Sequence, residues 1–322
     1  MQRRTALASL AALAAARGSR ADPPWPQRAV RIVVPSAPGS SLDLIARALG
    51  ERLAPRWGRP VLVEDRPGAG GVLGLDIAAK ARDGHTLALG FNGPVAFAPF
   101  LYRRMPYDPA RDLLPVVMTT SQPNVLAVNA AQVPARTVAE FVAWARRRPG
   151  GVSYSSLGNG SSAHLTMELF RHEAGFDAVH VPYNGSPPAA LAVAQGETEA
   201  SFMTAPALLP HVRNHKIRLL AVTGTQRLHG LDELPTMAQA GYANVQSMAW
   251  NGLLAPAGTP AAVLARINAD VNAVLHEPAL REALAAQGLA VVGGSAADFR
   301  RTIDADIQRW GPVITRLGIR LD

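Results

Sequence analysis

The feature that most restricts the fold of this sequence is a regular alternation of short apolar runs with longer amphipathic stretches from Val30 onward. The apolar runs, such as Thr86–Phe91 and Val125–Asn129, show almost no polar alternation, which is typical of strands buried on both faces. The stretches between them, such as Ser41–Leu53 and Pro260–His276, have the length of helices with one buried face. Strands that alternate with helices predict an α/β fold in which helices flank mostly parallel sheets.

The chain is predicted to form two lobes. Its 322 residues exceed the roughly 250–300 residues at which a single hydrophobic core stops growing. Two long extended segments, Val116–Asn129 and Val245–Pro256, suit strands that cross between the lobes. The first is interrupted at Gln122-Pro123, where we place a boundary. The prediction is a first lobe of residues 22–122 plus 250–322 and a second lobe of residues 123–249.

The first 21 residues have the pattern of a secretory signal peptide. Arg3-Arg4 precede an uncharged, mostly apolar stretch, Thr5–Ala16, and Ser19-Arg20-Ala21 forms a small-x-small cleavage site. The apolar stretch is shorter than the roughly 20 residues that span a bilayer as a helix. We predict removal of residues 1–21 and a mature protein in the periplasm. The paired arginines suit the twin-arginine export route, and the general secretion route stays an open alternative.

The composition of the remaining chain excludes several classes of function. The net charge of +8 includes four basic residues of the predicted signal peptide, which leaves +4 for the rest. That modest charge, with aromatic residues at 6%, provides no basic and aromatic surface for nucleic acid. The chain has no cysteine, which excludes disulfides, thiol nucleophiles and cysteine zinc sites.

Three junctions between a predicted strand and a predicted helix are rich in glycine, serine and proline. They comprise residues 35–43, 66–71 and 155–164. Glycine permits close approach to the backbone, and a helix N-terminus offers free N–H groups with a partial positive charge. Ligands of open α/β sheets bind outside the carboxyl ends of strands, where these junctions lie. We predict a small anion site of backbone amides and hydroxyls, with ordinary turn and cap roles as the alternative.

A dinucleotide site is a weaker interpretation of the third junction. The pattern Gly158-x-Gly160-x-x-Ala163 after a strand matches a relaxed dinucleotide fingerprint. The following strand, Val179–Tyr183, offers no acid for a ribose. We therefore predict no cofactor.

Metal binding and hydrolysis are also weaker interpretations. His164, Glu168 and His172 share one helix face, but their span is long for a single metal ion. Ser162 and His164 would suit a secreted hydrolase, yet no acid is placed to orient the histidine. We predict neither a metal site nor an enzyme, and the hydrolase stays a remote alternative.

A series of short segments in a fixed order is more specific than any single loop. They are Val30-Arg-Ile-Val-Val-Pro35, Ala37-Pro-Gly39-x-x-x-Asp43-x-x-Ala46-Arg47, Val63 to Gly71, Asp83-Gly-His-Thr-Leu87, Pro106-Tyr-Asp-Pro109, Ser155 to Leu165, His180-Val-Pro-Tyr183, Leu220-Ala-Val-Thr223, Trp250-x-Gly252 and Ala255 to Pro260. From about Pro26 to the C-terminus, the sequence resembles the Bug/TctC family of extracytoplasmic solute-binding proteins, which serve tripartite tricarboxylate transporters.

The resemblance implies a two-lobe periplasmic-binding-protein fold, the Venus flytrap, that closes on a small carboxylate such as a di- or tricarboxylate or an aromatic acid. It implies delivery of the ligand to a tripartite tricarboxylate-type permease by a monomeric protein. An orphan or sensory binding protein that reports its ligand to a membrane sensor is the alternative.

The resemblance also implies a set of ligand-binding residues. They are Pro38, Gly39, Ser40, Asp43, Ala69, Gly70, Gly160, Ser161, Ser162, His164, Tyr183, Thr204, Ala205 and Trp250. The sequence departs from the family pattern at Ser40, where a second glycine is usual, and near Thr204, where an aspartate is usual. Because an ammonium group needs a carboxylate partner, the second departure leads to the hypothesis of a ligand without an amine.

Overall fold

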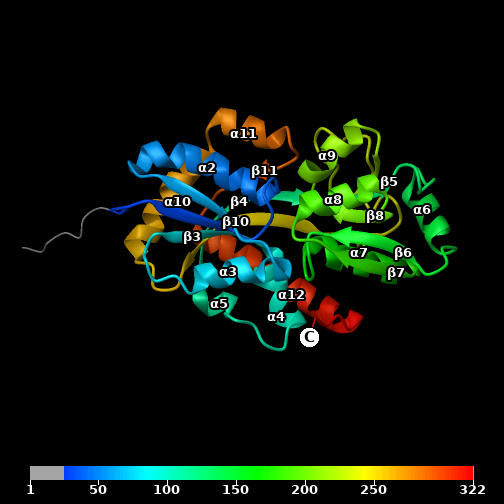
Figure 1. Cartoon of the computed structure of the whole chain (residues 1–322), viewed down its shortest axis with the longest axis horizontal. Helices are drawn as coiled ribbons and strands as arrows, with labels where there is room; N and C mark the ends of the chain where they lie inside the picture. Colours follow the sequence, from blue (N-terminus) through cyan, green and yellow to red (C-terminus); the bar gives the residue numbers. More distant parts are fainter. Residues whose placement is uncertain (1–24, 322) are drawn as a thin grey trace, which may run out of the picture.

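The computed structural model describes residues 25–321, so the predicted signal peptide lies outside the described residues. Two β-sheets, each covered by helices, lie side by side along the long axis of the molecule (Figure 1). The observed architecture is the predicted α/β fold with two lobes.

The first sheet has six strands, most of which point the same way. Its order is β11 (Ala290–Val291), β4 (Leu113–Pro123), β10 (Met248–Pro256), β3 (Thr86–Phe91), β1 (Val30–Val34) and β2 (Val61–Asp65). Strand β1 pairs parallel with β2 and β3, whereas β3 and β4 both pair antiparallel with β10. Strands β1 to β4 therefore share one direction, and β10 and β11 run against it.

The second sheet has five strands, most of which also point the same way. Its order is β7 (Ala178–Pro182), β6 (Val152–Ser156), β8 (Ala200–Met203), β5 (Val125–Asn129) and β9 (Ile217–Val222). Strand β6 pairs parallel with β7 and β8, and β5 pairs antiparallel with β8 and β9. Only β5 opposes the others, as expected for a strand that enters from the neighbouring sheet.

Helices cover both faces of each sheet. Those of the first sheet are α2 (Ser41–Trp57), α3 (Val72–Ala79), α10 (Ala261–Leu275), α11 (Pro278–Ala285) and α12 (Ala296–Leu317). Those of the second are α6 (Val138–Ala145), α7 (Ser162–Ala174), α8 (Ser186–Gln195) and α9 (Ala205–Arg213). Short helical segments are η1 (Ala69–Gly71), η2 (Gly93–Phe97), α4 (Ala98–Leu101) and α5 (Pro109–Asp112). Within residues 25–321 no helix combines the length and apolar character needed to cross a membrane.

Helix α12 contributes to hydrophobic clusters in both lobes. Near its start, Phe299 packs edge-on against Trp250 of β10, with ring centroids 5.1 Å apart. Near its end, Trp310 and Ile314 belong to the cluster that contains Phe141 and other residues of the second lobe. Figure 1 shows α12 in red, running below the sheets toward α7. The last helix therefore connects the two cores.

The chain passes between the sheets at a buried polar junction. Asn124, between β4 and β5, donates its backbone N–H to Thr223 Oγ1 at 2.9 Å. The same hydroxyl lies 2.5 Å from the carbonyl oxygen of Ser247, and the Asn124 amide nitrogen lies 3.1 Å from Ser247 Oγ. These residues are at most 1% exposed. The three connecting segments are thus joined by hydrogen bonds where the lobes meet.

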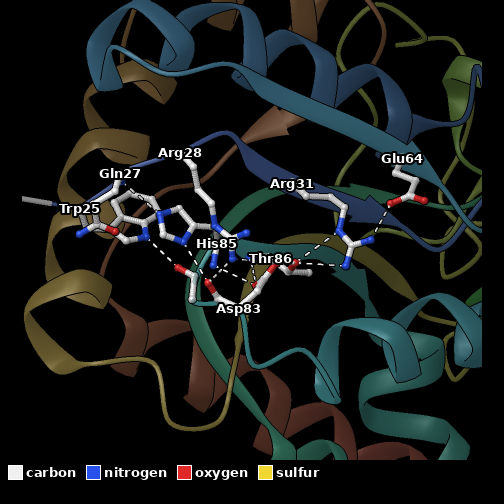
Figure 2. A network of polar contacts seen from close by, with 9 residues as sticks. Trp25, Gln27, Arg28, Arg31, Glu64, Asp83, His85 and Thr86 are labelled. Atoms are coloured by element: carbon white, nitrogen blue, oxygen red, sulfur yellow. Dashed lines mark hydrogen bonds and ion pairs between the residues drawn. The ribbon is translucent and has the colours of Figure 1, made fainter.

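The first described residues are fixed to the start of β3, as Figure 2 shows. Asp83 accepts the backbone N–H groups of His85 and Thr86 at 3.0 and 2.9 Å. Gln27 donates its N–H to His85 Nε2 at 3.2 Å, so the other ring nitrogen, Nδ1, carries the proton and donates to Asp83 O. Burial raises the pKa of Asp83, but the hydrogen bonds from His85 and Thr86 outweigh it and hold this pKa below its usual value. Asp83 therefore anchors the entry to the first sheet as a carboxylate.

Candidate functional site

A small cavity of about 20 Å³ lies between the lobes, at the carboxyl ends of strands from both sheets. Its lining residues are Ser36, Ser41, Leu42, Phe91, Asn92, Gln122, Leu157, Ser162, Ser186, Thr204, Ala249, Trp250 and Asn251. Serines and other neutral polar residues are mixed with aromatic and aliphatic ones. No lysine, arginine, aspartate or glutamate of residues 25–321 lines it.

Four helices begin at this cavity. Ser41, Ser162 and Ser186 are the first residues of α2, α7 and α8, and all three line the cavity. Helix α9 begins at Ala205, directly after the lining residue Thr204. The Thr204 side chain makes no capping hydrogen bond to its helix. Because a helix N-terminus carries about half a positive charge and free N–H groups, this convergence favours an anion.

The first glycine loop is held in shape by Ser40 and Asp43. Ser40 caps α2 by accepting the Asp43 N–H at 3.3 Å. The Asp43 carboxylate accepts the Gly39 N–H at 2.8 Å and pairs with Arg47 at 2.6 Å. Pro38 and Gly39 are exposed, whereas Ser40 and Asp43 are buried. Asp43 thus fixes the loop backbone through Gly39 and carries its charge against Arg47.

The third loop, like the first, is stabilised by a serine that caps the following helix, and a histidine also bonds to it. Ser161 caps α7 by accepting the His164 N–H at 3.3 Å, and its hydroxyl donates to Gly158 O at 2.7 Å. Gly160 donates its N–H to His164 Nδ1 at 3.1 Å. An imidazole nitrogen that accepts a hydrogen bond is unprotonated, and burial lowers the pKa of His164 to about 4. His164 is therefore a neutral ring that shapes the loop.

A second histidine stacks on the first behind the loop. The rings of His164 and His180 lie 4.0 Å apart at 13°, and His180 Nε2 lies 2.7 Å from Ser156 Oγ. Burial, followed by the neighbouring His164, lowers the pKa of His180 to about 3. Both rings are thus neutral near pH 7, which lets them stack without charge repulsion.

Glu168 and His164, which were considered for metal binding and hydrolysis, have other partners. Glu168 accepts the Tyr154 hydroxyl at 2.7 Å and pairs with Arg171 at 2.6 Å. No group of histidine and acidic residues within the described chain has a metal-binding arrangement. Since His164 Nδ1 is occupied by Gly160 N–H, this nitrogen does not act as a base toward Ser162.

The lobes touch through glycine backbones. A methyl group placed on Gly70 of η1 would lie 2.1 Å from the carbonyl oxygen of Asn159, in the third loop. One placed on Gly185, before α8, would lie 2.9 Å from Ala37 of the first loop. Gly70 has φ 61° and Gly185 has φ 134°, values that L side chains rarely adopt. The first contact places Ala69 and Gly70 of the second loop beside the third loop, and the second places the first loop against the junction before α8.

The remaining predicted residues divide into two groups. Thr204 and Trp250 are buried and line the cavity, whereas Ala205 is buried directly after Thr204 and is not part of the lining. The Trp250 indole N–H donates to Asp306 at 2.8 Å. Tyr183 is half-buried beyond the cavity lining, and its hydroxyl donates to Glu197 at 3.1 Å. The indole ring of Trp250 thus presents apolar surface to the cavity, and Tyr183 lies outside it.

The sequence analysis missed several cavity residues. Ser186 follows β7 in a fourth glycine- and serine-containing junction, Asn184-Gly185-Ser186, which had the same signal as the other three. Ser36 and Ser41 flank predicted residues of the first loop. Asn92 and Gln122 lie at the end of β3 and within β4, where no local pattern marked them.

Comparisons with known proteins show the family of the chain. The family described as "Tripartite tricarboxylate transporter family receptor" (TctC) matches residues 45–319. Protein BugT of Bordetella pertussis is 36% identical over 299 residues, covering 92% of this chain and 91% of BugT. A UPF0065 protein from the tcbD-tcbE intergenic region of Pseudomonas sp. (strain P51) is 34% identical, covering 97% and 94% of the two chains.

Solved structures show the same fold. An R. palustris protein with adipate has a TM-score of 0.89 and 35% identity, covering 92% of this chain and all of that one. MatC from Rhodopseudomonas palustris, with bound malate, has a TM-score of 0.86 and 29% identity, covering 90% of this chain and all of MatC. The shared family and fold mean that the protein belongs to the tripartite tricarboxylate transporter receptor family, the Bug/TctC solute-binding proteins, and is not an enzyme.

Proposed function

We propose that the protein captures a small organic acid between its lobes, with one carboxylate placed at the N-termini of α2, α7, α8 and α9. The observation that carries this proposal is the convergence of these four helices on a cavity that no lysine or arginine of residues 25–321 lines. Related structures with adipate and malate support the chemical class. Residues 1–21 would direct the protein to the periplasm, by the twin-arginine or the general route.

The energetics of such a site are sufficient for binding. Each helix N-terminus contributes about 0.3–1 kcal/mol when exposed and up to ~2 kcal/mol when partly buried. Hydrogen bonds to a charged group contribute about 1.5–3 kcal/mol each. A few of them reach the roughly −8 kcal/mol of micromolar affinity after ordering costs.

Binding is coupled to closure in this proposal. The lobes move about the junction of Asn124, Thr223 and Ser247. One lobe comprises residues 22–122 plus 250–322, and the other comprises residues 123–249. The acid bridges half-sites on both lobes, so its higher affinity for the closed form drives closure. The closed monomer then docks on a tripartite tricarboxylate-type permease. A membrane sensor is the alternative receiver.

The first experiment is native mass spectrometry of the purified protein before and after mild unfolding, followed by calorimetry with a panel of organic acids. We expect a released acid, or a panel member that binds and raises the melting temperature. A clean mass that no acid shifts, together with an unchanged melting temperature, would contradict the proposal. Reconstitution of the liganded protein with permease subunits or with a sensor distinguishes the two receivers.

A further inference from the structure

The cavity contains two amide side chains with polar atoms that lack partners. Gln122 of β4 is 1% exposed, and neither its Nε2 nor its Oε1 bonds to another described residue. Asn92, also 1% exposed, has an unpartnered Oδ1. Both residues line the cavity between the lobes. Buried polar atoms are almost always hydrogen-bonded, so these atoms indicate recognition of a further polar group.

The orientation of the Asn92 amide follows from its other contacts. One end donates to the carbonyl oxygen of Met248 at 3.0 Å, and the side chain also bonds to the carboxylate of Asp306. Both partners are acceptors, so this end is the NH2 group and the other end is the carbonyl oxygen. The free Oδ1 therefore requires a hydrogen-bond donor.

Gln122 requires both a donor and an acceptor. It lies opposite Ala249 in the pairing of β4 with β10, and its side chain reaches the cavity from the strand that crosses between the lobes. Its Nε2 donates and its Oε1 accepts. A carboxylate only accepts, so it satisfies the donor of Gln122 and leaves the oxygens of both amides unpaired.

Two groups that are common in organic acids donate hydrogen bonds: an ammonium and a hydroxyl. An ammonium needs a carboxylate partner when it is buried, and no acidic side chain of the described chain lines the cavity. A hydroxyl carries no charge; it accepts the Gln122 N–H and donates its single proton to one of the two amide oxygens. The unpartnered Oγ of Ser36, 2% exposed in the same cavity, adds another neutral partner.

We propose that Gln122 and Asn92 determine specificity by binding a hydroxyl group of the ligand, so that the protein selects hydroxy acids over the corresponding unsubstituted acids. This inference rests on the proposed carboxylate function and specifies its ligand class. The helix N-termini bind the carboxylate, and the two amides form hydrogen bonds with the hydroxyl.

The test is calorimetry with matched pairs of acids: lactate and propionate, 3-hydroxybutyrate and butyrate, malate and succinate. For a pair that binds, we expect the wild type to favour the hydroxy acid by at least about tenfold. In Gln122→Met, which keeps the side-chain length and removes both polar atoms, we expect this preference to fall below about threefold. The affinity for the unsubstituted acid should stay within about twofold of the wild type.

A matched control makes the same chemical change elsewhere. Gln132→Met alters an exposed loop residue whose amide bonds to Gly196 O, and it should keep the full preference. Thermal melting verifies folding, and we expect Gln122→Met to melt no lower than the wild type because it removes an unpaired buried amide.

The outcomes separate the two proposals. Acids that bind without a hydroxyl preference, or a preference that survives Gln122→Met, would overturn the role of Gln122 while the carboxylate function stands. The first of these results is also expected if Gln122 is paired by a bound water. Failure of every acid to bind would overturn the carboxylate function and, with it, this inference.

Discussion

Replacing Gly70 with alanine should prevent full closure of the lobes. The added methyl group would lie 2.1 Å from the backbone oxygen of Asn159, whereas ordinary contacts begin near 3.4 Å. Because the obstacle is backbone, it cannot swing away, and the lobes must separate there by about 1 Å or more. Overpacking of this kind costs about 1–3 kcal/mol in the closed form. We therefore expect ligand affinity to fall roughly 5- to 150-fold.

Gly58→Ala provides the matched control. Gly58 ends α2 with φ 63°, close to the 61° of Gly70, and a methyl group there meets no atom within 4 Å. Left-handed strain of about 1–2 kcal/mol should therefore lower the stability of both variants alike. Only Gly70→Ala should lose affinity.

Closure is measured directly with spin labels. The chain has no cysteine, so cysteines introduced at the exposed residues Lys80 and Lys216 provide unique labelling positions, one in each lobe. The distance between the two spin labels, measured by electron paramagnetic resonance, should shorten when the tightest-binding acid of the panel is added to the wild type or to Gly58→Ala. It should shorten less in Gly70→Ala. Equal closure and equal affinity in the two variants would refute the argument from the Gly70 contact.

Three further predictions concern stability, measured by urea unfolding. Burial raises the pKa of Asp306 to about 6, so the folded state holds a proton that the unfolded state releases, and the stability from this group falls as pH rises from about 4 to 6. Asp306→Asn should remove this pH dependence, which amounts to up to about 3 kcal/mol. An unchanged pH dependence in the variant would refute the role of Asp306. The lowered pKa values of His164 and His180 have the opposite effect on stability, which should fall as pH drops from about 6.5 toward 3. In His180→Phe we expect a smaller loss of stability over this range. An equal loss would exclude His180 as a cause. Asp83→Ala removes the acceptor for two backbone N–H groups and should cost about 1–2 kcal/mol while ligand affinity is retained; a loss of affinity would contradict its purely anchoring role.

The strands were the most predictable elements of the fold. The expected runs Thr86–Phe91 and Val125–Asn129 coincide with β3 and β5. These strands are buried along their whole length, so their apolar runs end where burial ends. Sequence alone therefore located the centres of both sheets.

Helix α9 could not be predicted in the same way. It contains Pro206 and Pro210, and proline normally interrupts a helix. Pro206 lies in the first turn, where its missing N–H costs nothing, and burial of Ala207 and Leu208 supports the rest of the helix. Tertiary packing overrides local propensity here.

The candidate site was predictable where it depends on local backbone signals. Ser40 and Ser161 cap α2 and α7, as expected for loops that open helices. Gln122 was different, because the sequence analysis placed it at a break between two extended runs. It instead lies inside β4, and only the pairing with β10 brings it to the cavity. Such a long-range register has no signature in the sequence around Gln122.

The position of α12 has a consequence for protein engineering. Its 22 residues span about 33 Å and place Phe299 in one core and Trp310 in the other. Residues 123–249 are therefore not a transplantable module, since in isolation they would expose the apolar surface that Trp310 and Ile314 cover. A chimera that exchanges this segment between relatives must also exchange the end of α12, or its core will be mismatched.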